Sequence, residues 1–451
     1  MNLRTVSSLI AAVALAAVTY ARPELVISND QRGLIYIGSF GFLPGGTLDM
    51  KLEGLKVVPY EGDDGKEKRI GFLIQRGSSD ADIVEWEEGC VLDDPYFKDD
   101  IDQGRGEFQL LDTTKPNFDY HHEVLPGEQE MWNILFVNCP RSIVSFKLKT
   151  TEINPDNNYL SAGDIPLPKV YAGSAIAYFG ASTLWLYMLM KKDTRVFWPH
   201  KLMLVLAVMI GIQKTFQAIK INYMKKGEDA EGWTVMFYIF AFLKGSLSIL
   251  IITLIASGWM FIKPFLSPKD KKIILVIIPL QILSNIASTI SSETAIGSVK
   301  WSFWTQLFPM IDLISCVVIL GVIIQTQRHL GEAAEAEGKV AENKVKYKLW
   351  GSFYLVTVVY IYLTRIMVEF LKVALPYQYV QWLVELLNEA ITLGFYATIG
   401  WKFRPYANNP YTLIDEDDPD NEDIEAGVNG GETHGLQTMS RREGRTNEHD
   451  E

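Results

Sequence analysis

The chain contains 451 residues, of which 48% are hydrophobic, and its formal net charge is −12. The charged residues form no long basic tract, so the composition gives no indication of nucleic-acid binding. Apolar residues are concentrated in long runs after residue 170, whereas the region before it has the mixed composition of a soluble domain. We therefore expect a soluble domain followed by a membrane domain.

The N-terminus has the three parts of a secretory signal peptide. Arg4 supplies a positive charge, and an alanine-rich apolar segment follows at residues 6–18. The small side chains of Thr19 and Ala21 predict cleavage after Ala21, so residues 1–21 are assigned to the signal peptide. An uncleaved anchor is the alternative, but the apolar segment is short for a hydrocarbon core of about 30 Å.

Residues 22–165 are predicted to form a luminal all-β domain with a sandwich architecture. Leu48 and Met50 alternate with Asp49 and Lys51, which is the period of a strand with one buried face. Further short candidate strands lie at residues 70–74, 108–111, 131–137 and 144–149. The polar stretch at residues 154–164 is interpreted as a linker into the membrane domain.

Cys90 and Cys139 lie in this luminal region, and Cys316 lies in an apolar run. Because an oxidising compartment permits disulfides, we expect a Cys90–Cys139 bond, with two buried thiols as the alternative. Cys316 is interpreted as a packed apolar residue. His121 and His122 are assigned to a polar loop, without the further ligands that a metal site needs.

Seven apolar segments follow, and each is long enough to cross a bilayer as a helix. They lie at residues 170–190, 201–221, 234–262, 273–291, 303–325, 349–374 and 380–401. Residues 166–403 are therefore assigned to a transmembrane α-helical bundle of seven helices, in contact with membrane lipids.

The basic residues predict the orientation of this bundle. The first, third and fifth connections, counted with Lys201 at the start of the second segment, contain 13 Lys and Arg residues, and the other three contain 3. Because cytoplasmic loops are enriched in Lys and Arg, the odd connections are predicted to be cytosolic. The signal peptide places the N-terminal domain in the lumen, and the two arguments agree only for an odd number of spans.

Residues 404–451 are interpreted as an acidic disordered cytoplasmic tail. Tyr411 and Ile414 form a Tyr-x-x-apolar motif, the form that clathrin adaptors bind as an extended peptide. An acidic cluster follows directly, made of Asp415, Glu416, Asp417 and Asp418. We interpret the motif as a sorting signal, and a purely solvating tail is the alternative.

Five charged residues lie inside the predicted spans, where an ionisable group is costly and requires a partner or a wet cavity. This predicted intramembrane polar cluster comprises Lys214, Lys244, Asp312, Arg365 and Glu389. An ion-pair network that fixes helix register, a functional cavity for a lipid, an ion or a proton, and separate snorkelling are the three explanations. Lys220, Glu369 and Glu385 lie nearer the span ends, where snorkelling accounts for them.

Residues 154–414 resemble the lung seven-transmembrane receptor family, also called GOLD-domain seven-transmembrane proteins, which includes a Golgi-localised orphan receptor-like branch. The matching segments lie at residues 154–155, 159–169, 231–233, 243–245, 258–263, 270–273, 364–366, 402–405 and 409–411. The resemblance implies a GOLD-like luminal domain, and Lys244, Asp312, Arg365 and Glu389 match charged positions that recur in the family. Before residue 154 only Phe40, Gly41 and Phe42 with the following Gly pair are similar to it.

No enzyme motif occurs, so we expect no catalytic residues, no cofactor and no metal. The resemblance and the tail favour a trafficking protein that cycles between the Golgi apparatus and the trans-Golgi network, endosomes or plasma membrane. Its luminal domain would bind a protein or lipid of unknown identity, and its tail would engage clathrin adaptors. The alternatives are a receptor of the G-protein-coupled type and an ion channel or transporter that uses the buried charges.

Overall fold

The computed structural model describes residues 24–59, 69–77, 89–191, 196–256, 268–294, 340–367 and 374–405, with single residues between 296 and 328 and at 370–371. The predicted signal peptide lies outside these residues, as do Asp312, the Tyr411–Ile414 motif and the acidic cluster. In the described part of the chain, β-strands occur up to residue 153 and long helices follow from residue 167.

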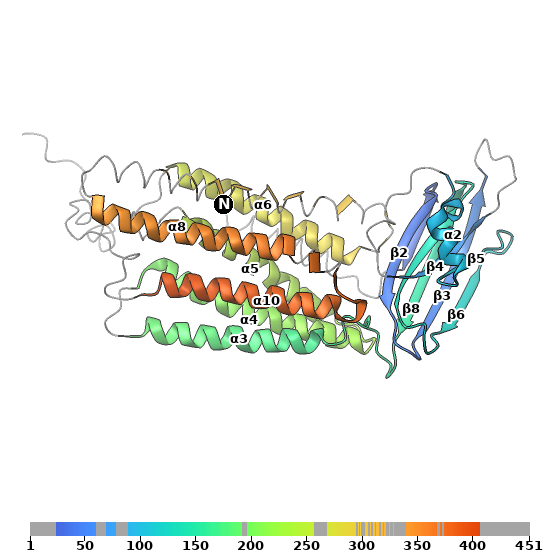
Figure 1. Cartoon of the computed structure of the whole chain (residues 1–451), viewed down its shortest axis with the longest axis horizontal. Helices are drawn as coiled ribbons and strands as arrows, with labels where there is room; N and C mark the ends of the chain where they lie inside the picture. Colours follow the sequence, from blue (N-terminus) through green and yellow to red (C-terminus); the bar gives the residue numbers. More distant parts are fainter. Residues whose placement is uncertain are drawn as a thin grey trace, which may run out of the picture. The chain divides into compact units, whose positions relative to one another are not determined.

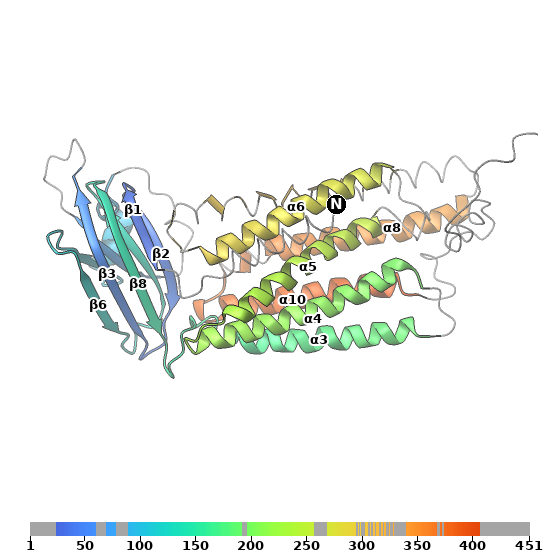
Figure 2. The ribbon, with the colours of Figure 1, turned by 180° about the vertical axis from the view of Figure 1, so that it is seen from behind.

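The N-terminal domain contains two antiparallel sheets, each with four strands in the described residues (Figures 1 and 2). The first sheet has the order β1-β8-β3-β6 and the second has the order β2-β7-β4-β5. The strands are β1 (Leu25–Asp30), β2 (Leu34–Gly41), β3 (Thr47–Val58), β4 (Ile70–Arg76), β5 (Gly106–Leu110), β6 (Phe118–Glu123), β7 (Met131–Asn138) and β8 (Ile143–Ile153). The predicted all-β domain is therefore present.

The core of this domain lies between the two sheets. Met50 of β3 is fully buried, and Phe146 of β8 packs against Phe136 of β7 with 4.6 Å between the ring centroids. The period-two alternation predicted for β3 and β8 is what directs these side chains inward. β7 is buried along nearly its whole length, because a second cluster covers its other face.

That second cluster holds a short helical segment against the outer face of the second sheet. Val91 of the 3-10 turn η1 (Val91–Asp93) and Phe97 of helix α2 (Pro95–Asp102) pack on residues of β4 and β7. The predicted disulfide between Cys90 and Cys139 is present at this place, with 4.8 Å between the two Cα atoms. It joins the start of the helical segment to the end of β7.

One local prediction was wrong. His121 and His122 lie in strand β6 and not in a loop, where His121 Nδ1 is 2.6 Å from Asp49 Oδ1 on the neighbouring β3. β6 is an edge strand with alternate residues exposed, so its polar sequence is compatible with strand structure. The stretch from residue 154 connects β8 to α3, as expected of a linker, and it is ordered, because the buried Asn154 side chain accepts a hydrogen bond from Leu43 N and donates to Gly41 O.

The helical domain contains α3 (Leu167–Leu189), α4 (Trp198–Lys225), α5 (Glu231–Ala256), α6 (Pro268–Glu293), α8 (Val340–Tyr362) and α10 (Tyr377–Lys402). α8 continues into a π-helical turn, η2 (Leu363–Met367). These helices correspond to six of the predicted segments, whereas only isolated helical residues are described within 303–325. Trp198–Lys225 and Glu231–Ile255 have mean hydropathies of 1.8 and 2.1 and are long enough to cross a bilayer.

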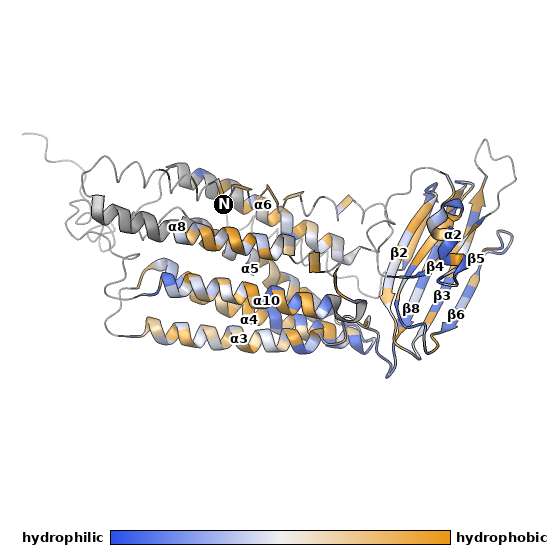
Figure 3. Ribbon diagram, viewed as in Figure 1, coloured by the Kyte–Doolittle hydropathy of each residue, from blue (hydrophilic) through white to orange (hydrophobic). Residues whose placement is uncertain are grey.

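The helices pack through apolar side chains and also present apolar side chains outward. α3, α4 and α5 are neighbours in chain order, and α10 packs on α3 and α8 (Figures 1 and 2). Hydrophobic residues occur along the whole of α3 (Figure 3), and one of them, Ile176, is 73% exposed. A helix that is apolar on both its packed and its outer faces is typical of a membrane domain.

The turn between α4 and α5 requires a glycine. Gly227 has φ +70°, and a Cβ atom there would lie 2.6 Å from the Tyr159 ring. Tyr159 N also donates to Lys225 O at 3.0 Å, at the end of α4. The segment before α3 is thereby fixed to this turn, which sets where α3 begins.

Candidate functional site

The centre of the helical domain contains a buried ion pair between α4 and α10. Lys214 Nζ lies 2.6 Å from Glu389 Oε1, and the two side chains are 5% and 9% exposed. The ammonium group also lies 4.9 Å from the centre of the Tyr171 ring on α3. The consecutive helices α3 and α4 and the distant helix α10 therefore meet at one cation.

Two amides on α4 extend this polar centre. Lys214 Nζ donates to Gln217 Oε1 at 3.0 Å, and Gln213 Nε2 donates to the same oxygen at 3.3 Å. Glu389 Oε2 and Gln213 Oε1 are buried without a hydrogen-bond partner among the described atoms. A buried acceptor of this kind lacks compensation for lost hydration, so the centre retains the capacity to accept a hydrogen bond.

A second group of charges lies close to the ion pair. Lys244 of α5 interacts electrostatically with Lys214, Glu389 and Glu385. Glu385, one turn before Glu389 on α10, lies within hydrogen-bonding reach of the Tyr171 hydroxyl. Asp164 precedes α3, and its burial, together with the nearby Glu385 carboxylate, raises its pKa to about 6.

The structure brings together only part of the predicted polar cluster. Lys214, Lys244 and Glu389 lie in one region, whereas Asp312 lies outside the described residues. Arg365 lies in the π-helical turn η2, and its side chain is outside the described part of the chain. Lys220 does not simply snorkel, because its Nζ lies 3.2 Å from the hydroxyl of Tyr238 on α5.

Sequence reasoning missed the aromatic and amide members of the site. No role was predicted for Tyr171 and Tyr178 on the apolar helix α3. Gln213 and Gln217, spaced one turn apart on each side of Lys214, were the available signal. Polar residues at helical spacing beside an intramembrane charge indicate a shared polar face.

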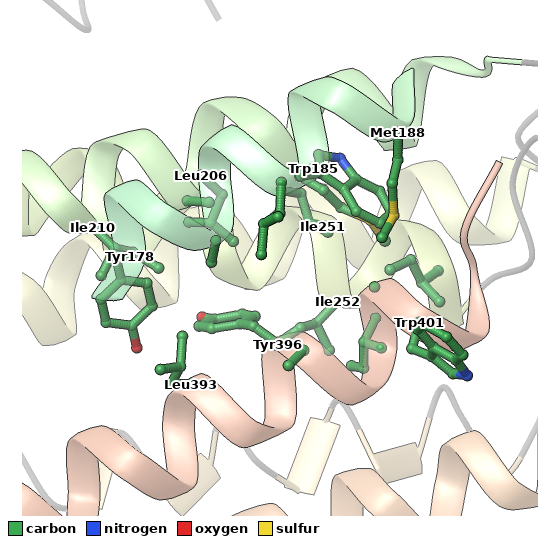
Figure 4. Close-up of a pocket in the computed structure, with 18 residues that line it drawn as sticks. Tyr178, Trp185, Met188, Leu206, Ile210, Ile251, Ile252, Leu393, Tyr396 and Trp401 are labelled. Atoms are coloured by element: carbon green, nitrogen blue, oxygen red, sulfur yellow. The ribbon is translucent and has the colours of Figure 1, made fainter. Parts of the chain in front are cut away.

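An apolar cavity of about 360 Å³ lies between α3, α4, α5 and α10 (Figure 4). Its lining contains the aromatic residues Tyr178, Trp185, Tyr396 and Trp401 and no charged residue. Tyr396 follows Glu389 by two helical turns on α10, so the cavity and the ion pair share one face of that helix. Pockets of this size and apolar composition are typical of small-molecule sites.

A buried histidine connects α3, α4 and α10 near the start of α4. His200 of α4 accepts a hydrogen bond from Phe197 N at Nδ1, 3.0 Å away, and its Nε2 lies 2.7 Å from Phe403 O. A carbonyl accepts only, so Nε2 carries the proton and donates. His200 O in turn accepts from Trp185 Nε1 at 3.0 Å. His200 thus ties the start of α4 to α3 and to the end of α10.

This geometry has the properties of a binding or coupling site. No group of three or more potential metal ligands occurs in the described ranges. Two features are suited to binding. One is a buried ion pair with an unsatisfied carboxylate oxygen, and the other is an apolar cavity with tyrosines in its lining.

The sequence of the chain is similar to known proteins over most of its length. A family model described as "GOST, seven transmembrane domain" matches residues 166–410. An Arabidopsis thaliana protein named "candidate G-protein coupled receptor 6" is 30% identical over 407 residues, which cover 88% of this chain and 92% of that protein. The match to the relative includes most of the β domain as well as the helices.

Proposed function

The chain belongs to the GOST seven-transmembrane family, and from this premise we propose that it sorts cargo in membrane trafficking between the Golgi apparatus and endosomes. In this proposal, seven helices cross the bilayer, the β domain lies in the lumen and the acidic tail lies in the cytosol. The β domain binds a protein or lipid, and the tail binds clathrin adaptors.

The observation that carries the proposal is the tail sequence. Tyr411 and Ile414 have the spacing of an adaptor-binding peptide, in which two apolar side chains fill separate pockets of the adaptor. The motif begins nine residues after Lys402, the last residue of α10, so an extended peptide reaches an adaptor at the membrane surface. The adjacent acidic cluster is of the kind that accompanies tyrosine signals in proteins that cycle through the Golgi.

The β domain supports the luminal part of the proposal. A disulfide between Cys90 and Cys139 is stable in an oxidising compartment and is rare in the cytosol. The same domain is packed around its own apolar core, so it is suited to present a binding surface outside the membrane. The expectation that it faces the lumen therefore agrees with its chemistry.

The test is the steady-state location of a C-terminally tagged chain and of two variants. Tyr411→Ala and Ile414→Ala remove the two apolar anchors, whereas Thr412→Ala changes an intervening position and is the matched control. We expect the parent and Thr412→Ala in the Golgi, and both anchor variants at the cell surface with slower internalisation. An unchanged distribution of both anchor variants would contradict adaptor binding.

A receptor acting through G proteins is the second candidate, because the Arabidopsis relative is named as a candidate of that class. The sequence after α5 reads Trp259, Met260, Phe261 and lacks an Asp/Glu-Arg-Tyr triplet, so rhodopsin-type coupling has no residue support. Stimulation of guanine-nucleotide exchange by the purified protein would favour this candidate over sorting.

A channel or transporter is the third candidate, and the Lys214–Glu389 pair is the observation in its favour. Buried charges in membrane domains mark ion and proton pathways in many transporters. Flux in proteoliposomes that is lost in Glu389→Gln, with the folded fraction unchanged, would support it. A Glu389→Gln variant that only unfolds would assign the pair to structure.

A further inference from the structure

The cavity between α3, α4, α5 and α10 is an apolar slot of about 360 Å³. Aromatic rings contribute to its walls, and small residues such as Ala181, Ala207 and Gly400 leave space between the rings. A Cβ atom at Gly400 would lie 3.4 Å from the Trp185 ring, so the helices approach closely around the slot. Small residues opposite aromatic rings leave room for a rigid or extended apolar body.

One end of the slot is polar. The hydroxyl groups of Tyr178 and Tyr396 lie at the same end of the cavity, and Trp185 and Trp401 lie toward the other (Figure 4). Tyr178 is 2% exposed, and its hydroxyl has no hydrogen-bond partner among the described atoms. The Tyr396 hydroxyl is already bonded to Ser248 on α5. An unpartnered, buried hydroxyl at the end of an apolar slot is a costly arrangement, and a polar ligand group that reaches its oxygen would relieve it.

The slot is open toward the outside of the helix group. Two of its lining residues, Leu184 on α3 and Trp401 on α10, are 64% and 66% exposed. In a membrane domain, the medium outside these helices is lipid. A membrane lipid therefore has direct access to the slot from the bilayer.

We propose that this slot binds an apolar membrane lipid with one hydroxyl group, which occupies the Tyr178 end and exchanges hydrogen bonds with the Tyr178 hydroxyl. The apolar body of the lipid lies between α3 and α10 and reaches toward Trp401. A sterol and a single-chain alcohol both have this chemistry. The inference does not depend on the sorting function.

The charges near the slot determine which headgroups it accepts. Glu389 acts electrostatically on both Tyr178 and Tyr396, and Lys214 on the adjacent α4 is already paired with it. None of the described lining residues is cationic, and Arg404, which lies 4.2 Å from the centre of the Trp401 ring, is at the other end of the slot. An anionic phosphate or carboxylate headgroup would therefore meet repulsion without a counter-charge, whereas a neutral hydroxyl donates or accepts a hydrogen bond at no charge cost.

The experiment uses the purified full chain in lipid nanodiscs with four photoreactive probes. These are a diazirine derivative of cholesterol, a diazirine fatty alcohol, a diazirine fatty acid and a diazirine phosphatidylcholine. Two variants act on the slot: Ala207→Phe fills it, and Tyr178→Phe removes one oxygen atom. Tyr187→Phe, which removes a hydroxyl from the exposed side of the same helix, is the matched control.

We expect saturable labelling by at least one hydroxyl probe, with modified peptides in α3 or α10, and weak labelling by the acid and the phospholipid. Tyr178→Phe weakens competition by the unlabelled hydroxyl lipid roughly two- to tenfold, the effect of one hydrogen bond. The methyl ether of that lipid can accept a hydrogen bond from Tyr178 but cannot donate one, so Tyr178→Phe should weaken its competition less than that of the free alcohol. Which hydroxyl probe labels distinguishes a sterol from a single-chain alcohol.

Three results would overturn the proposal: equal labelling by the fatty acid, labelling only outside α3 and α10, or hydroxyl-lipid competition unchanged in Tyr178→Phe. Ala207→Phe is expected to abolish labelling while the protein remains monodisperse. If that variant does not fold, Tyr178→Phe and the position of the modified peptide decide the question, because the loss of one oxygen atom preserves the shape of the side chain.

Discussion

Lys214 of α4 and Glu389 of α10 form a buried ion pair in which the Nζ–Oε1 distance is 2.6 Å. The two residues belong to the second and the last of the predicted spans, so this contact joins two helices that are far apart in the sequence. A charge in an apolar medium is tolerated when it is paired. We therefore expect the pair to fix the register of α10 against α4.

The first prediction concerns the cost of breaking this pair. Glu389→Gln leaves an uncompensated ammonium group and is expected to lower the free energy of unfolding by about 3–5 kcal/mol. The double variant Lys214→Met with Glu389→Met removes both charges and is expected to recover most of that loss. Thermal unfolding in detergent measures both, with Lys201→Met, an exposed position on α4, as the control. If the double variant were as unstable as the single one, the loss would come from removal of the pair itself and not from the unpaired ammonium group.

The sequence revealed the charged residues but not their partners. Lys214, Lys244 and Glu389 were conspicuous because each interrupts an apolar run, and Arg365 was an equally good partner for Glu389 on sequence grounds. The choice depends on which helices are neighbours, and hydropathy carries no information about neighbours in a bundle. The cavity could not be predicted at all, because it results from small residues on α3, α4 and α10 that meet only in the folded protein.

The β domain shows the same limit in another form. The alternation in β3 and β8 predicted both strands correctly, because each has one face on the core. β6 was missed because its sequence, FDYHHE, is polar, as suits an edge strand that packs only part of each side chain. Asn154 was assigned to a linker, since only the folded protein shows that its amide satisfies buried backbone groups of β2 and the following turn.

The second prediction concerns His200. His200→Phe preserves much of the ring volume but leaves Phe197 N and Phe403 O without their hydrogen bonds. We expect a loss of about 1–3 kcal/mol in the free energy of unfolding. His200→Gln retains a donor and an acceptor and should lose less. A thermal unfolding series that ranked Gln below Phe would show that ring packing, and not hydrogen bonding, holds this junction.

The third prediction concerns the disulfide of the β domain. Replacement of Cys90 and Cys139 by Ser together should lower the stability of this domain by about 2–5 kcal/mol, because the unfolded chain gains freedom over the loop between them. The readout is the resistance of the β domain to limited proteolysis at increasing temperature. Reductant should weaken the parent and Cys316→Ser alike and have no effect on the double variant. An equal effect of reductant on the double variant would show that another bond is responsible.

The last prediction follows from Asp164, whose pKa is raised from 3.8 to about 6 by burial and by the nearby Glu385 carboxylate. Since the folded form binds the proton more tightly than the unfolded form, the free energy of unfolding rises as the pH falls through 6 and levels off below 3.8. Asp164→Asn should therefore be more stable than the parent at pH 7.5, with a difference that disappears toward pH 4 in thermal unfolding scans. Asp93→Asn is the control of opposite sign, because Arg69 lowers the pKa of that exposed carboxyl. Glu385→Gln should lower the pKa of Asp164, so the midpoint of the pH dependence should move to lower pH than in the parent. An unchanged midpoint would leave burial as the sole cause of the raised pKa.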